Sequence, residues 1–96
     1  MAGQNRELKK AGLKVTAPRL KILAMLSDAS EQGDHLSAED LYQRLRDTGE
    51  DIGLATVYRV LTQFETADLI IRHNFEAGYS VFEIAPDHQH DHIWRL

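Results

Sequence analysis

The sequence predicts an α+β fold, a winged helix-turn-helix in which four helices are followed by a two-stranded β-hairpin wing. Apolar residues recur at helical spacing in several segments before Asp68. After Asp68 the period changes to two, and the segment LIIRHNFEAGYSVFEI alternates in polarity on both sides of a central glycine. Closely linked helices followed by such a hairpin have the element order of the winged helix-turn-helix.

Two helices are expected in the N-terminal third of the chain. Residues 5–11 suit a short first helix that Gly12 ends, because glycine readily takes the left-handed conformation found after helix C termini. A second helix should begin after Thr16, whose hydroxyl can cap backbone N–H groups, with Pro18 in its first turn. The apolar stripe of this second helix consists of Leu20, Ile22, Leu23 and Leu26.

A third helix is expected after the loop SEQGDH. Ser37 can cap this helix, and Gly49 can end it. Acidic residues in the first turn, Glu39 and Asp40, suit the positive end of the helix dipole. The side chains expected to point inward are Leu41, Tyr42 and Leu45.

The fourth helix, expected from about Leu54, has two contrasting faces. One face is the stripe that a core would bury, with the spacing i, i+3, i+4, i+7: Val57, Val60, Leu61 and Phe64. The opposite face has the same spacing but unusual residues for a solvated surface: Ala55, Tyr58, Arg59 and Thr62. No acidic residue occurs between Leu54 and Gln63. The first strand of the hairpin is expected at about 69–75 and the second at 79–84.

The second face of the fourth helix suits the DNA major groove, which admits one helix. Arg59 can donate two parallel hydrogen bonds to guanine, and the apolar edges of Tyr58 and Ala55 can pack on a thymine methyl group. Thr56 and Thr62 can reach a phosphate or a base edge. Phosphates would repel long acidic side chains, which explains their absence. The alternative is a partner protein, because Tyr and Arg are also enriched at protein interfaces.

Composition restricts the classes of function. The 96 residues suit one domain with a short tail, and the absence of cysteine excludes disulfides, thiolate metal sites and cysteine nucleophiles. The N-terminal segment lacks the apolar core of a signal peptide, and the longest apolar runs are too short to span a bilayer. We therefore expect a cytoplasmic protein with no membrane partner. No catalytic constellation is recognisable, so an enzyme is not expected.

Charge is distributed unevenly along the chain, although the net charge is only −4. Residues 1–26 hold six basic residues and one acidic residue, a formal charge of +5. Residues 27–96 hold five basic and fourteen acidic residues, a formal charge of −9. A basic N-terminal face suits a polyanion such as DNA. The alternative is a solvated first helix whose charges maintain solubility.

The C-terminal segment DHQHDHIWRL, residues 87–96, holds three of the five histidines. His88, His90 and His92 alternate, and in an extended segment they would project from one face, a geometry that suits metal ligation. A metallohydrolase motif of the H-x-H-x-D-H kind does not fit, because Asp91 lies between His90 and His92. The alternative is a polar hinge with unliganded histidines.

Four segments resemble the ferric uptake regulator family of bacterial metal-responsive repressors: LKKAGLKVTAPRLKIL, LSAEDLYQRL, GLATVYRVLTQFE and RHNFEAGYSVFE. The resemblance covers about residues 7–84, and GLATVYRVL is highly specific. It implies a winged-helix DNA-binding domain in residues 1–84 and, in residues 85–96, a hinge toward a dimerisation domain that is absent. The RHNFE and KKAGLKVT segments are most similar to the iron-responsive branch.

The resemblance implies an Fe²⁺-dependent repressor of iron-uptake genes that binds AT-rich operators. The implied partner is double-stranded DNA, bound by a homodimer of the longer family member, whereas this chain alone is expected to be a monomer. Two alternatives remain: a zinc or peroxide sensor of the same family, or a winged-helix protein-interaction module without DNA affinity.

Site residues follow from the resemblance position by position. Tyr58 and Arg59 match residues that contact bases in the major groove, and Lys14 matches a lysine that enters the adjacent minor groove. We infer a phosphate contact for Arg19 from its position near the start of the second helix. The implied regulatory metal site contains His35, Glu83, His90 and His92, and Asp91 matches a ligand of a further, more variable site. The implied ion is Fe²⁺, with Zn²⁺ or Mn²⁺ as substitutes, in a site that is incomplete in this chain.

Overall fold

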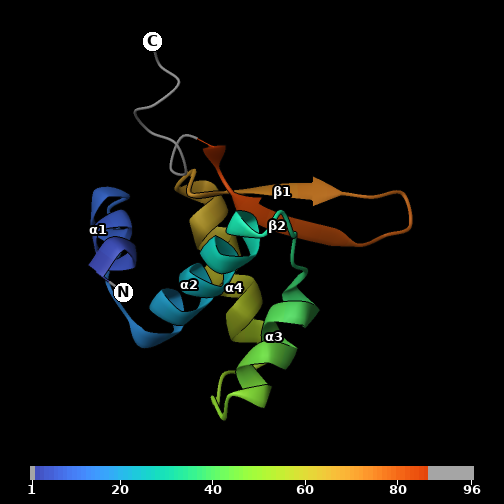
Figure 1. Ribbon diagram of the computed structural model, residues 1–96, viewed down its shortest axis with the longest axis horizontal. Coiled ribbons are helices and arrows are strands. Elements are labelled where there is room, and N and C mark those ends of the chain that lie inside the picture. Colours follow the sequence, from blue (N-terminus) through green and yellow to red (C-terminus); the bar gives the residue numbers. More distant parts are fainter. Residues whose placement is uncertain (1, 87–96) are drawn as a thin grey trace.

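The computed structural model describes residues 2–86 and shows a helical body from which a β-hairpin projects (Figure 1). The helices are α1 (Ala2–Lys10), α2 (Ala17–Glu31), α3 (Ala38–Asp47) and α4 (Leu54–Thr66), and the strands are β1 (Ile70–Asn74) and β2 (Ser80–Ile84). The strands are antiparallel, with Ile70 opposite Ile84. This is the predicted α+β winged helix-turn-helix, and we call the hairpin the wing.

The helix ends follow the expected local chemistry. Thr16 accepts a hydrogen bond from the backbone N–H of Arg19 at the start of α2. Ser37 and Asp40 cap α3 reciprocally, with distances of 3.0 and 3.1 Å between side-chain oxygens and backbone nitrogens. The first helix begins at Ala2, earlier than the expected residue 5. Residues 2–4 contain no proline and so can join its first turn.

One apolar core joins the helices to the wing. The stripe predicted for α4 is buried in full, and it packs with buried side chains of α2 and of both strands: Val57, Val60, Leu61, Phe64, Ile22, Leu23, Leu26, Ile70, Phe82 and Ile84. Leu20 and Tyr42 were expected to point inward but are only partly buried at the margin of the core. Burial of the complete stripe turns the opposite face of α4 to the outside.

The loop before α3 is joined to the wing by backbone hydrogen bonds. The N–H of Phe82 donates to the carbonyl of Leu36 at 2.8 Å, and the N–H of Leu36 donates to the carbonyl of Phe82 at 3.3 Å. This bridge places His35, the residue before Leu36, beside the base of the wing. In the part of the chain described here, no helix has the length and apolar character needed to cross a membrane.

Candidate nucleic-acid interface and metal centre

The outer face of α4 presents the residues that the sequence predicted for DNA contact. Ala55, Tyr58, Arg59 and Thr62 are exposed, whereas Thr56 is partly buried. Tyr58 is 43% exposed, a high value for a large aromatic side chain on a helix. The helix therefore offers apolar, hydroxyl and guanidinium groups to a partner from a single rigid element.

An acidic residue from a different helix contacts this face. The hydroxyl of Tyr58 donates a hydrogen bond to Oε2 of Glu39, in the first turn of α3, at 2.7 Å. The hydrogen bond to Glu39, together with desolvation and the negative charge of the same residue, raises the pKa of Tyr58 above its ordinary value. The α4 sequence contains no carboxylate between Leu54 and Gln63, but the fold supplies one beside Tyr58.

Arg19 lies at the junction of α2, α4 and the loop that carries Lys14. Its Nη1 donates to the backbone carbonyl of Lys14 at 2.8 Å, and its Nη2 donates to Oε1 of Gln63 at 2.8 Å. Arg19 thus fixes the Lys14 loop against α4, while the Lys14 side chain is exposed. The phosphate contact inferred for Arg19 stays a prediction, and the structure assigns this residue a positioning contact.

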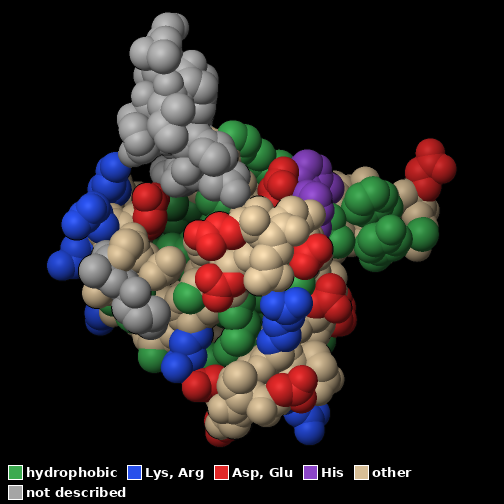
Figure 2. Space-filling view, in the orientation of Figure 1, with side chains coloured by type: hydrophobic (Ala, Val, Ile, Leu, Met, Phe, Trp, Pro, Cys, Tyr) green, Lys and Arg blue, Asp and Glu red, His purple; other side chains and the backbone are tan. Residues whose placement is uncertain are grey.

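Basic side chains gather over α1, as Figure 2 shows. The exposed cations of this helix are Arg6, Lys9 and Lys10. Lys21, on α2, forms an ion pair with Glu50, with 3.0 Å between Nζ and Oε2. The positive charge of the N-terminal third is therefore partly neutralised within the protein at Lys21.

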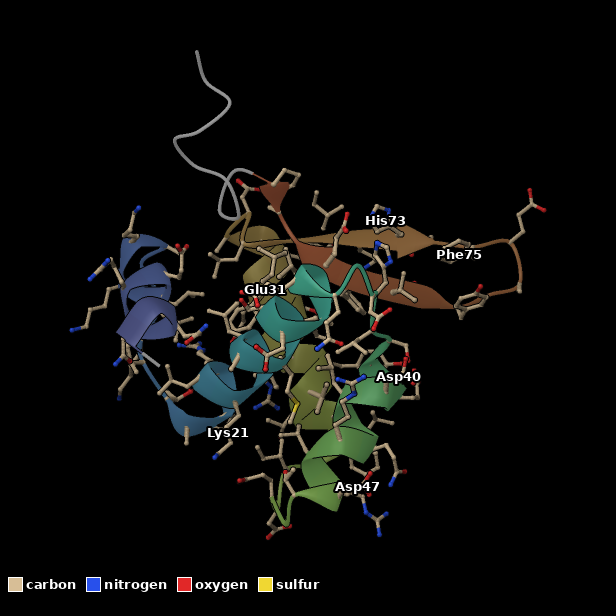
Figure 3. All side chains as sticks on the ribbon, in the orientation of Figure 1. Lys21, Glu31, Asp40, Asp47, His73 and Phe75 are labelled. Atoms are coloured by element: carbon tan, nitrogen blue, oxygen red, sulfur yellow. The ribbon has the colours of Figure 1, made fainter. Side chains whose placement is uncertain are left out.

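The candidate metal centre lies at the base of the wing and consists of His35, His73 and Glu83. Nε2 of His35 is 2.9 Å from Oε1 of Glu83, and Nε2 of His73 is 2.8 Å from Oε2 of Glu83. The two imidazole rings meet edge to face, with centroids 5.6 Å apart. Histidines gather at this position in Figure 2, and Figure 3 shows His73 on β1, closer to the helical body than Phe75.

The register of the wing explains how these side chains come together. Glu83 pairs with Ile71, and His73 pairs with Val81, so His73 and Glu83 are diagonal neighbours on one face of the hairpin. The opposite face carries Phe82 into the core. The hydrogen bond with His73, with the charges of His35 and His73, lowers the pKa of Glu83 and outweighs the opposing effect of desolvation.

The three donors suit a divalent transition-metal ion. Their ligand atoms all lie within 4.8 Å of one another, and imidazole nitrogen with carboxylate oxygen is a donor set used by zinc and by iron. Metal–ligand bonds of about 2.0–2.2 Å would require only small side-chain adjustments from these positions. A bound cation would replace the contacts that Glu83 makes with the two imidazoles.

The structure brings together two of the residues expected in the metal site, His35 and Glu83. It adds His73, which sequence reasoning missed although the expected hairpin register would have placed it on the same face as Glu83. His90, His92 and Asp91 lie outside the described residues. The ligand role of all five expected residues stays a prediction.

These features define the class of the protein as a winged helix-turn-helix with a candidate metal centre beside its wing. Residues 10–95 match the model of the ferric uptake regulator family, and the chain belongs to that family. The ferric uptake regulation protein of Pseudomonas aeruginosa is 61% identical over 90 residues, which are 94% of this chain and 66% of that protein.

Two solved structures are similar to this fold. The ferric uptake regulator of Vibrio cholerae superposes with a TM-score of 0.78 and 58% identity, over 88% of this chain and 63% of that one. The regulator of Pseudomonas aeruginosa with manganese superposes with a TM-score of 0.76 and 66% identity, over 85% and 60% of the two chains. The chain thus spans somewhat less than two thirds of the length of these relatives.

Proposed function

We propose that this chain is the DNA-binding part of a metal-dependent transcriptional repressor that controls iron-uptake genes through AT-rich operators. Residues 1–84 are the DNA-binding domain, and residues 85–96 are the hinge toward the remainder of a longer protein. Family membership supports this proposal, and the related Vibrio cholerae regulator is described as having DNA-binding domains. The acting form is a homodimer of the longer protein, in which two such domains contact two half-sites.

The observation that carries the proposal is the outer face of α4. Its exposed residues include Tyr58 and Arg59, while the opposite stripe is buried in the core. A helix held in this way can enter the major groove as a rigid body. There Arg59 donates to guanine O6 and N7, and Tyr58 packs on a thymine methyl group. Arg19 holds the Lys14 loop beside α4, from which Lys14 contacts the adjacent minor groove.

The regulatory ion is Fe²⁺, which Zn²⁺ or Mn²⁺ can replace in solution. Within residues 2–86, His35, His73 and Glu83 would hold it, and the hinge residues His90 and His92 would add further ligands. The ion would supply a positive charge and directed bonds that join the loop before α3 to the wing. Support comes from the donor set and from the related Pseudomonas aeruginosa regulator with manganese.

DNA binding can be tested by fluorescence anisotropy with the 96-residue chain. The probe is the AT-rich duplex that the chain enriches most from a randomised library, compared with a scrambled duplex of the same composition. A single domain lacks the second half-site, so we expect a dissociation constant of roughly micromolar or weaker at physiological salt. Arg59→Ala should cost about 1–3 kcal/mol on the selected duplex and reduce the preference for it.

Two further variants complete this experiment. Lys14→Ala should weaken binding to both duplexes similarly and reduce the salt dependence, because its contacts do not distinguish sequences as finely. Arg44→Ala is the matched control, since Arg44 is an exposed arginine of α3 that lines a groove with Asp34 and Asp40. If no sequence is enriched and Arg59→Ala binds DNA like the original chain, a protein-interaction module becomes the better account.

A further inference from the structure

A groove of about 390 Å³ separates the start of α3, the outer face of α4 and the wing. It is lined by Ala38, Glu39, Tyr58, Arg72, Tyr79 and Phe82, among others. Tyr58 and Tyr79 are 43% and 52% exposed, so both rings can be reached from outside. The groove therefore joins the proposed base-contacting tyrosine to a carboxylate and to the wing.

Glu39 and Arg72 have different partners within this groove. The guanidinium of Arg72 pairs with Glu65, with 3.0 Å between Nη2 and Oε1, and lies 5.1 Å from the centre of the Phe82 ring. The carboxylate of Glu39 instead accepts the hydroxyl hydrogen of Tyr58 at 2.7 Å. Within residues 2–86, Glu39 forms no ion pair. Within the described residues, the hydroxyl of Tyr58 is therefore the side-chain partner of the Glu39 carboxylate.

We propose that Glu39 is a positioning residue for DNA recognition, because it holds the ring of Tyr58 in the orientation that contacts a base. This inference rests on the proposed function of α4. An exposed tyrosine rotates about two side-chain torsions, and contact with a thymine methyl group requires one orientation of the ring. A short hydrogen bond to a carboxylate is stronger than one to a neutral acceptor and restricts that rotation.

The carboxylate has a second effect that must be separated from positioning. A negative charge near the interface repels phosphates of every sequence, so its removal should strengthen binding to all duplexes. The ratio of affinities for the selected and the scrambled duplex is not changed by such a uniform effect. Positioning of Tyr58 affects only the contact with a base, and this contact distinguishes the selected duplex from the scrambled one. Loss of positioning should therefore change the ratio of affinities.

The test measures the ratio for the original chain and four variants by fluorescence anisotropy, with the AT-rich duplex selected by this chain and its scrambled version. Glu39→Ala removes the hydrogen bond and should lower the ratio about three- to tenfold. Glu39→Gln retains an oxygen acceptor without the charge, so the ratio should change less than about twofold. Tyr58→Phe should lower the ratio, and adding Glu39→Ala to it should cause no further decrease.

Controls separate this inference from others. Glu31→Gln removes the same charge from an exposed position at the end of α2 and should leave the ratio unchanged. Thermal unfolding of each variant detects any loss of folding, since Glu39 also lies in the first turn of α3. The inference is overturned if Glu39→Ala leaves the ratio intact, or lowers it equally with and without the Tyr58 hydroxyl. If Arg59→Ala also has no effect, the proposed function of α4 fails with it.

Discussion

Nε2 of His73 lies 2.8 Å from Oε2 of Glu83, across the two strands of the wing. The other oxygen of Glu83 lies 2.9 Å from Nε2 of His35, which follows α2 in the chain. One carboxylate thus joins the wing to the loop before α3. All three residues belong to ordered elements of the fold or to the loop that is hydrogen-bonded to β2, so the candidate metal centre is largely preformed.

The preformed cluster predicts that His73 contributes to zinc binding. His73→Ala should weaken Zn²⁺ binding by about tenfold or more at neutral pH, because it removes one of three donors placed by the wing. Isothermal titration calorimetry of the 96-residue chain measures this change. His88→Ala is the matched control, a histidine that the family resemblance does not place in the regulatory site. Equal affinities of the original chain and His73→Ala would exclude His73 as a ligand.

The lowered pKa of Glu83 predicts a pH-dependent contribution to stability without metal. A carboxyl group whose pKa is lower in the folded state stabilises that state above its ordinary pKa, and the effect is lost as pH falls through the folded value. Glu83→Gln should therefore lower the melting temperature at about pH 6, and lower it progressively less as the pH falls toward about 3.

Glu76→Gln provides the comparison for this measurement, because Glu76 is exposed at the tip of the wing. Its effect on the melting temperature should be small at both pH values. A destabilisation by Glu83→Gln that is just as large near about pH 3 would show that the ionised carboxylate is not its source.

The contact between Tyr58 and Glu39 predicts that this tyrosine ionises at a higher pH than an unperturbed tyrosine. The hydrogen bond and the adjacent charge raise the pKa of Tyr58 above its ordinary value of 10.0. In Glu39→Ala the pKa should fall toward that value, since both causes are removed. Ultraviolet difference titration, with Tyr58→Phe to identify the signal, measures the shift. Unchanged ionisation in Glu39→Ala would mean that the hydrogen bond does not form in solution.

The backbone conformation of Asp68, just after α4, predicts that a substitution at this position will stabilise the fold. Its φ angle is 62°, a left-handed conformation that costs a side chain energy and that glycine adopts readily. Asp68→Gly should raise the free energy of unfolding by about 0.5–1 kcal/mol in urea denaturation. Gly49→Ala, at φ 82°, should lower it by a similar or larger amount. Destabilisation by Asp68→Gly would contradict this account of the helix end.

Elements with a strong periodic pattern could be predicted from the sequence. The start of α4 and the burial of its stripe followed from the spacing of Val57, Val60 and Leu61, and the caps at Thr16 and Ser37 followed from local hydrogen-bond chemistry. These features depend on residues close together in the chain. Periodicity therefore determined which face of α4 is exposed.

Contacts between distant segments could not be predicted in the same way. The hydrogen bond from Tyr58 to Glu39 depends on how α3 packs on α4, which the pattern of neither helix specifies. The proximity of His35 to Glu83 depends on the backbone bridge between Leu36 and Phe82, and only the family resemblance indicated it. His73 was missed because no local pattern links this residue of β1 to His35, which the same bridge brings beside it.

The most direct test of the central claim, that the outer face of α4 contacts DNA, is an NMR titration of the ¹⁵N-labelled chain with the selected AT-rich duplex. We expect the largest changes in amide chemical shift between Ala55 and Thr62 and at Lys14, with little change at the wing tip around Phe75. The claim is contradicted if the shifts concentrate at the wing tip or on α1 while the amides of α4 remain unchanged.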